Sequence, residues 1–219
     1  MDSLIQTLAI YAIPVIFAIT LHEAAHGYVA RHFGDPTAWQ LGRITLNPVK
    51  HIDPVGTILV PTMILIASKI AGSSGILFGW AKPVPVNFGR LRNPKKDMLW
   101  VAAAGPGANL VMALGWALLL KLAVGMPDNA CSLPLAEMAR AGINVNAVLM
   151  LLNLLPLPPL DGGRIAVSLL PHRAAWQFAK LEPYGFVILL VLLFTGLLDF
   201  WLIPLMRIFL MLIKSLFGF

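Results

Sequence analysis

Charged residues are scarce in this sequence. Lys, Arg, Asp and Glu make up 12% of the 219 residues, whereas hydrophobic residues make up 58% and the mean hydropathy is +0.82. A soluble domain of this size carries about a quarter charged residues. The chain therefore lacks the polar surface of a water-soluble enzyme or a disordered protein, and we interpret it as an integral membrane protein.

The sequence has a single cysteine, and its acidic residues are outnumbered by Lys and Arg. The single cysteine, Cys131, cannot form an internal disulfide and fits no metal-binding spacing. The net charge of +6 would suit a nucleic-acid partner, but Lys and Arg gather in the cytoplasmic loops of any membrane protein. We therefore expect no nucleic-acid partner and no role for the cysteine.

Long runs without charged residues are present instead. A helix needs roughly 20 apolar residues to cross a bilayer. The candidate spans are 4–21, 98–120, 141–160, 183–198 and the largely apolar tail 200–219. They predict an all-α membrane protein, a polytopic bundle of about four to six transmembrane helices. We expect one integral-membrane domain over 1–219, with a core of about 4–182 and C-terminal helices in 183–219, and no cleaved signal peptide because no basic residue precedes the first run.

The distribution of basic residues predicts the orientation. The loop between the 98–120 and 141–160 helices has two basic residues opposed by two acidic ones, which is typical of the outer side. If the basic segments all face the cytoplasm, the apolar stretch 55–71 cannot cross once, so we expect it to enter the membrane and return. These segments hold Arg31, Arg43, Lys50, Lys82, Arg90, Arg92, Lys95, Lys96, Arg164, Arg173 and Lys180.

Residues 79–87 read Gly-Trp-Ala-Lys-Pro-Val-Pro-Val-Asn. Proline and β-branched residues disfavour a helix and favour extended backbone. Backbone that is not helical is tolerated at membrane depth only where it is buried or lines a cavity. The sequence therefore predicts a small strand-like, membrane-associated loop at the edge of a water-filled cleft.

A candidate metal site lies at the end of the first apolar run, in His22-Glu23-Ala24-Ala25-His26. Helical residues at i and i+4 share one face, so both imidazoles can bind one ion. Glu23 is placed to act as general base on water at that ion, the pattern of zinc metalloproteases. Charged groups inside a span are costly and are by default functional.

A third ligand is needed, because catalytic zinc usually has three protein ligands. His32 lies on another face of the helix, and we expect His51 to be structural and His172 to be on the surface. Asp161 ends a charge-free run, after three prolines and before Gly162 and Gly163. Its position alone leaves two alternatives open, a metal-bound carboxylate or an ordinary helix-terminus turn at the membrane surface.

Two motifs together resemble the site-2 protease family of intramembrane zinc metalloproteases. They are the His22–His26 motif and Asn153-x-x-Pro156-x-x-x-Leu160-Asp161-Gly162. The stretch Ala-Gly-Pro-Gly-Ala-Asn at 104–109 and the order of segments are also similar to that family, over roughly residues 8–185. Since no segment is long and polar enough for a PDZ or CBS domain, the chain looks like the short prokaryotic branch.

The resemblance implies a function and a set of roles. One zinc ion would be bound by His22, His26 and Asp161, and Glu23 would activate water. Asn153 would donate to the substrate carbonyl as it becomes an oxyanion. The activity would be hydrolysis of peptide bonds in or near transmembrane segments of other proteins, by a multi-pass enzyme of the plasma or inner membrane whose site lies toward the cytoplasm.

The same resemblance gives the strand-like loop a use. A substrate helix must unwind before cleavage, and an edge strand around 83–87 would capture it by β-addition, with Val84, Val86 and Asn87 as binding residues. Pro83 and Pro85 lack N–H donors, so only one edge of that strand can pair. The alternatives are a metal-ion transporter using the same ligands and an inactive scaffold. A transporter does not need a glutamate beside the metal, and an inactive scaffold does not need the intact set of four residues. The sequence leaves the substrate and the oligomeric state open.

Overall fold

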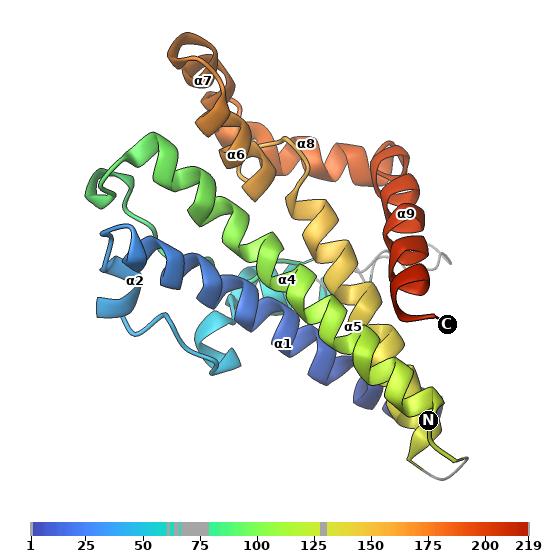
Figure 1. Ribbon diagram of the computed structural model, residues 1–219. Coiled ribbons are helices and arrows are strands. Elements are labelled where there is room, and N and C mark those ends of the chain that lie inside the picture. Colours follow the sequence, from blue (N-terminus) through green and yellow to red (C-terminus); the bar gives the residue numbers. More distant parts are fainter. Residues whose placement is uncertain (1, 61, 64–65, 67–78, 128–130, 219) are drawn as a thin grey trace.

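The computed structural model is built from helices (Figure 1). It describes residues 2–60, 62–63, 66, 79–127 and 131–218, and no strand occurs among these. An all-α membrane protein is therefore confirmed. The α-helices are α1 (Asp2–His32), α2 (Thr37–Gln40), α4 (Pro94–Val124), α5 (Ser132–Asn153), α6 (Asp161–Leu169), α7 (His172–Ala179), α8 (Glu182–Phe194) and α9 (Asp199–Phe217). Short 3-10 helices cover Pro48–His51 and Phe88–Arg90, and a π-helix covers Pro54–Leu59.

Four helices in the described part of the chain are long and apolar enough to cross a membrane: Ala9–His32 of α1, then α4, α5 and α9. The pair α7 and α8, bent by 63°, would make a fifth span. This agrees with the expected four to six. Helix α5 differs from the predicted 141–160: it starts earlier because exposed Glu137 and Arg140 are tolerated near its start, and it stops at Asn153 because prolines follow.

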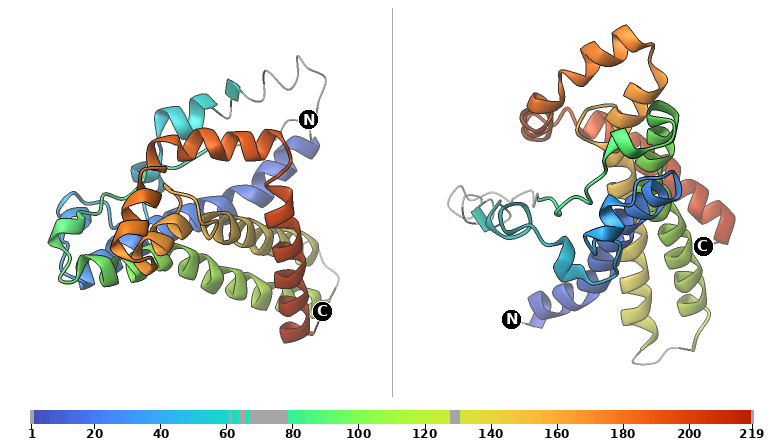
Figure 2. Two further views of the ribbon diagram at one scale, coloured as in Figure 1. Left: turned by 90° about the horizontal axis from the view of Figure 1, so that it is seen from above. Right: turned by 90° about the vertical axis from the view of Figure 1, so that its left-hand side faces the viewer.

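Helices α1, α4 and α5 pack against one another and form the centre of the fold (Figures 1 and 2). The buried face of α1 repeats every four residues and is lined by Pro14, Ala18, His22, His26 and Ala30. Five of the eleven buried residues of its partner α4 are Ala or Gly, which lets the helix backbones approach closely. These small residues are Ala102, Gly105, Ala113, Ala117 and Ala123.

The remaining long helices lie beside the bundle. Helix α6 packs on α4 and leads into α7, while α9 crosses α5 and α4 and packs on them through its second half (Figures 1 and 2). Leu157, Leu189 and Leu198 bury together and join the turn after α5 to α8 and to the start of α9. This places the start of α6 beside the centre of the bundle.

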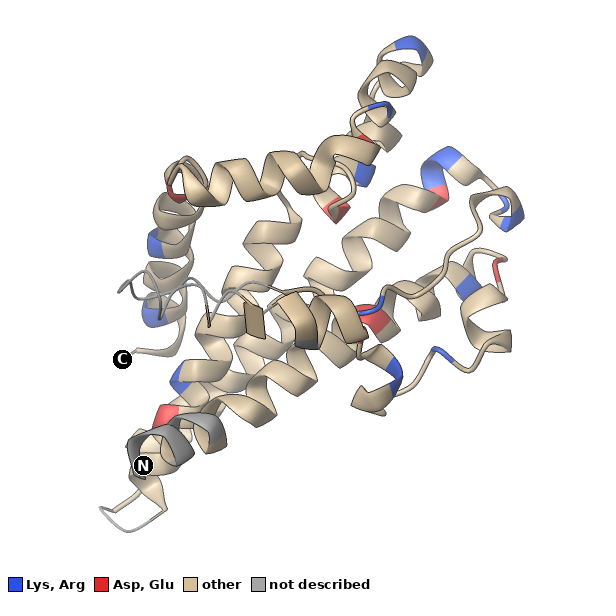
Figure 3. Cartoon of the chain, turned by 180° about the vertical axis from the view of Figure 1, so that it is seen from behind, with Lys and Arg blue, Asp and Glu red and all other residues tan. Residues whose placement is uncertain are grey.

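The chain leaves α1 and enters α4 at the same end of the bundle. Arg92 bonds there to the end of α1: its N–H donates to the Phe33 carbonyl at 3.0 Å and its Nη2 to the His32 carbonyl at 2.9 Å. Lys and Arg gather mainly around this end (Figure 3). Of the stretch 55–71, which we expected to enter the membrane and return, residues 61, 64–65 and 67–71 lie outside the described residues, so that prediction stays open.

The predicted strand-like loop, residues 79–87, contains neither helix nor strand. It is held in place by hydrogen bonds to other loops and to side chains, and not by pairing with a neighbouring strand. The Lys82 N–H donates to the His51 carbonyl at 2.9 Å, and Arg43 Nη2 donates to the Lys82 carbonyl at 2.9 Å. Pro83 and Pro85 have no N–H group, and the bonds just described use other backbone groups. Too few N–H donors are left for the loop to pair with a strand.

Candidate metal centre

His22 and His26 lie one turn apart on the buried face of α1, as their spacing predicts. Only 7% of His22 and 9% of His26 is exposed. The rings meet edge to face at 82°, with centroids 4.7 Å apart, and the two Nε2 atoms are 3.0 Å apart. Both imidazoles therefore aim at one point.

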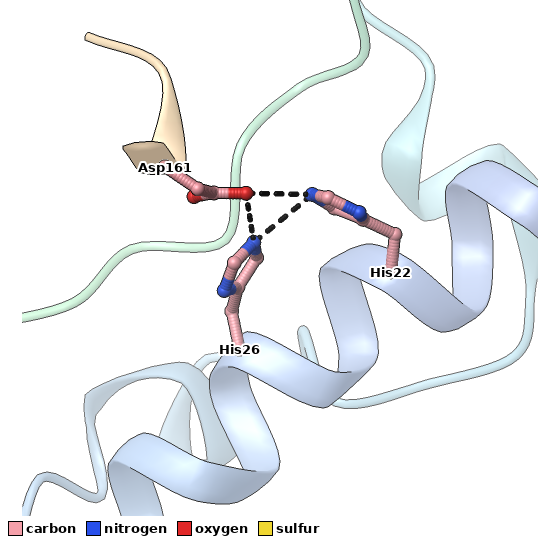
Figure 4. A group of neighbouring side chains, drawn as sticks. All are labelled: His22, His26 and Asp161. Atoms are coloured by element: carbon pink, nitrogen blue, oxygen red, sulfur yellow. Dashed lines mark hydrogen bonds and ion pairs between the residues drawn. The ribbon is translucent and has the colours of Figure 1, made fainter. Parts of the chain in front are cut away.

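Asp161 reaches the same point from α6, opposite the helix that carries the two histidines (Figure 4). Its Oδ2 lies 3.2 Å from His22 Nε2 and 3.3 Å from His26 Nε2. It is the first residue of α6 and is 8% exposed, so it begins a helix and also faces the histidines. Asp161 therefore does begin a helix, but it is buried beside the histidines and does not have the exposed position that the turn alternative assumed.

The glycines after Asp161 explain how it is held there. A Cβ on Gly162 would lie 2.3 Å from the Leu154 carbonyl oxygen, and one on Gly163 would lie 2.2 Å from the Pro158 nitrogen. No side chain fits at such separations. Glycine lets α6 pack directly on the turn that follows α5, and this contact sets the position of Asp161.

The far nitrogen of each imidazole is fixed by an acceptor on α4. His26 Nδ1 donates to the Val101 carbonyl at 2.7 Å, and His22 Nδ1 donates to Asn109 Oδ1 at 2.5 Å. A carbonyl oxygen only accepts, so the proton of each neutral ring sits on Nδ1 and the Nε2 lone pair faces the central point. Metal-binding histidines are usually oriented by such a partner.

The three converging atoms fit a zinc ion. Tetrahedral zinc with ligands at about 2.0–2.1 Å places those ligands about 3.3 Å apart, and the observed separations are 3.0–3.3 Å. Two nitrogen lone pairs and a carboxylate oxygen repel one another unless a cation lies between them. Among the residues that the structure describes, none donates a hydrogen bond to the buried Asp161 Oδ2.

A further feature suits a cation at this point. Gly105 of α4 provides room, because a Cβ there would lie 2.4 Å from His26 Nε2 and 2.5 Å from His22 Nε2. Helix α4 can approach the ligands this closely only with glycine.

Comparison with known proteins identifies the family. "Putative zinc metalloprotease YwhC" of Bacillus subtilis is 43% identical over 198 residues, which are 89% of this chain and 84% of that protein. "Putative zinc metalloprotease Rip2" of Mycolicibacterium smegmatis is 32% identical over 187 residues, 85% of this chain and 67% of that protein. The protein of the same name from Mycobacterium tuberculosis H37Rv is 30% identical over 190 residues, with the same two shares.

This chain belongs to that zinc metalloprotease family. No family model matches the chain, and no solved structure matches it. The names of these relatives imply zinc, which agrees with the donor set of the three converging residues. None of the relatives named here is called a transporter, so the transporter alternative gains no support.

In this zinc metalloprotease the predicted base, Glu23, lies beside His22 and is half-buried. Its Oε2 accepts a hydrogen bond from the Val84 backbone N–H at 2.7 Å. The other carboxylate oxygen forms no bond with the described residues. The loop 79–87 therefore contacts the motif helix at its acidic residue.

The other predicted site residues have different surroundings. Asn153, the last residue of α5, donates from Nδ2 to the Leu149 carbonyl at 2.9 Å within its own helix. Val86 packs against the buried Ala30 cluster, and the Asn87 N–H donates to Asp35 Oδ2 at 2.6 Å. Within the described chain, none of these residues forms a hydrogen bond or ion pair with His22, His26 or Asp161, and their roles remain predictions.

Three residues that support the site were missed by sequence reasoning. Asn109 and Asn146 are fully buried amides on α4 and α5, and Asp35 is a fully buried carboxylate after α1 that holds Asn87 and Thr37. A weak signal existed for Asn109, which ends the Ala-Gly-Pro-Gly-Ala-Asn stretch at 104–109. Asn146 and Asp35 had no signal beyond being polar residues close to apolar runs.

Proposed function

We propose that this protein is an intramembrane zinc endopeptidase of the site-2 protease type, which cleaves other proteins in or near a transmembrane segment. The convergence of His22, His26 and Asp161 within 3.0–3.3 Å carries the proposal. Two of these ligands lie within the candidate span Ala9–His32. A site inside a span suits a substrate that is itself held in the bilayer.

The ligand set would be His22, His26 and Asp161. When bound, zinc supplies a Lewis acid that polarises a peptide carbonyl and acidifies water. Glu23 would take a proton from the attacking water on the carboxylate oxygen that Val84 leaves free, and would pass it to the leaving amine. Because the Val84 N–H holds Oε2, the carboxylate has one defined orientation from which to do this.

Asn153 would donate to the developing oxyanion. Its Nδ2 carries two protons, and the bond to the Leu149 carbonyl uses one of them. The second proton is therefore available to a substrate. A preorganised amide of this kind typically contributes about 10²–10³ in rate.

The loop 79–87 would receive the unwound substrate, with Val84, Val86 and Asn87 as contacts. The Lys82 N–H already bonds to the His51 carbonyl and the Val84 N–H to Glu23. Of the donors on this edge, the Val86 N–H alone forms no bond with the described residues. Pairing along the whole edge would therefore require Val84 to release Glu23.

The compartment and the family branch are also proposed. The gathering of Lys and Arg at the end of the bundle where α1 leads into α4 supports a cytoplasmic location for that end, and hence for the site (Figure 3). We propose a multi-pass protein of the plasma or inner membrane, in the branch without PDZ or CBS domains. Its partners would be the lipid bilayer and single-span membrane proteins, cleaved in regulated intramembrane proteolysis.

A matched pair of proteins tests the proposal. Wild type and Glu23→Gln are purified in detergent, their zinc content is measured, and both are incubated with a panel of single-span substrates. Both should hold one zinc per chain, and Glu23→Gln should cleave about 10²–10⁴-fold more slowly, because glutamine still accepts the Val84 N–H but cannot take a proton. Equal zinc content with no cleavage by either protein, together with zinc flux into liposomes, would favour the transporter instead.

A further inference from the structure

The two proposed histidine ligands are oriented by different kinds of partner. His26 relies on a backbone carbonyl, that of Val101, whereas His22 relies on the side chain of Asn109. A backbone acceptor cannot turn round, but a side-chain amide can present either its oxygen or its NH₂ group. The orientation of His22 therefore depends on what holds the Asn109 amide.

Asn146 of α5 holds the side-chain amide of Asn109 in one orientation. Asn109 Nδ2 donates to Asn146 Oδ1 at 2.9 Å and to the Ala18 carbonyl at 3.2 Å. Asn146 Nδ2 in turn donates to the Gly142 carbonyl at 2.8 Å, so its own Oδ1 must face Asn109. Each hydrogen bond in this series can form in only one donor-to-acceptor direction. Asn109 Oδ1 must therefore face His22 Nδ1.

We propose that Asn109 and Asn146 are positioning residues for zinc binding, whose paired amides keep His22 in the tautomer that turns its Nε2 lone pair toward the metal. If the Asn109 amide turned round, its NH₂ would face Nδ1, and His22 would have to carry its proton on Nε2. That proton would point at the metal. The inference rests on the proposed zinc site, but it does not depend on any substrate.

The burial of the pair explains why amides are used. Both asparagines are 0% exposed and lie within candidate spans. A carboxylate, a common partner of metal-bound histidine, would be costly there. An amide offers the same acceptor oxygen without charge, but it needs a second group to fix its direction. Asn146 supplies that group from a neighbouring helix.

Shape-matched leucine variants test the idea. Asn109→Leu, Asn146→Leu and the double variant are made in the full chain, with Asn144→Leu, an exposed position on α5, as the control. Each protein is purified in detergent. Its zinc dissociation constant is measured by competition with a chromophoric chelator, and its thermal midpoint is measured in the absence of zinc.

Zinc affinity and stability should respond differently. Asn109→Leu should weaken zinc binding about 10–100-fold, the usual effect of losing such a partner. Asn146→Leu should weaken it by a smaller factor, since the Ala18 carbonyl still opposes rotation of the amide. The double variant should bind zinc as weakly as Asn109→Leu, because Asn146 acts only through Asn109. Its thermal midpoint should exceed that of Asn109→Leu, because Asn146 no longer lacks a partner.

Two results would overturn the inference. One is a zinc dissociation constant within twofold of wild type in every folded variant, whatever the thermal midpoints, which would make the pair a packing contact only. The other is a further loss of affinity when Asn146→Leu is added to Asn109→Leu. Wild type that binds no zinc would refute the proposed zinc site itself, a separate outcome.

Discussion

The carboxylate of Glu23 accepts a hydrogen bond from the backbone N–H of Val84, 61 residues away in the sequence, at 2.7 Å. This bond connects the motif helix to a loop that has no regular secondary structure. The loop is also tied by the Asn87 N–H to Asp35 at 2.6 Å. Two acidic side chains, one at the site and one after α1, therefore fix the backbone of 84–87.

Replacement of Val84 by proline removes the N–H and should disorient Glu23. We expect about a tenfold or larger fall in the cleavage rate, since a bond to a charged group contributes about 1.5–3 kcal/mol, with zinc content unchanged. Val84→Ala is the control, because alanine keeps the N–H while it loses the same side-chain packing and side-chain contact with the substrate as proline does. Equal activity of the proline and alanine variants would argue against a role for this bond.

Asp161→Ala should lower zinc occupancy, because it removes the carboxylate oxygen that lies 3.2 and 3.3 Å from the two imidazole nitrogens. Metal content after dialysis against a weak chelator measures the effect. Asp199→Ala, at an exposed position at the start of α9, should leave zinc unchanged. Unaltered metal content in Asp161→Ala would remove this residue from the ligand set.

Gly105→Ala should abolish zinc binding without changing any ligand. The added Cβ would come within 2.4 Å of His26 Nε2 and must push the histidines or α4 aside. Gly107→Ala is a close control, because a Cβ there meets nothing within 4 Å and alanine favours a helix. Zinc affinity measured for both should separate steric displacement from general helix effects, and equal affinities would show that α4 can shift without cost.

Removal of zinc should destabilise the fold. Without a cation, the two Nε2 lone pairs and the Asp161 carboxylate face one another unscreened. Zinc added at 100 times its dissociation constant should restore about 2.7 kcal/mol, seen as a higher thermal midpoint. Glu23→Gln should show the same shift, whereas His26→Ala should show none; a shift that persisted in His26→Ala would point to zinc bound elsewhere.

The sequence predicted helices and their buried faces correctly where one property, such as hydrophobicity, repeats along the chain. Low charge and long apolar runs predicted the membrane helices, and the i and i+4 spacing of His22 and His26 predicted their shared face. The helix ends were less accurate. The charge-free run 141–160 leaves out the first part of α5, because Glu137 and Arg140 are exposed on a helix whose other face is buried.

Residues that act through contacts between distant segments were harder to predict. Position alone left Asp161 open between a ligand and a turn, and the glycine contacts with the turn after α5 decide where it points. Asn109 and Asn146 look like ordinary polar residues in apolar helices. Their pairing appears only when α4 and α5 are placed side by side.

By itself, the sequence determined the membrane class, the two histidines on one helix face and the acid between them. These features depend on hydrophobicity and helical periodicity, which are local properties of the chain. Tertiary structure alone decided that Asp161 meets the histidines, that Val84 holds Glu23 and that Asn146 holds Asn109. Each of these is a contact between segments that are far apart in the sequence, so hydrophobicity and helical periodicity do not specify it.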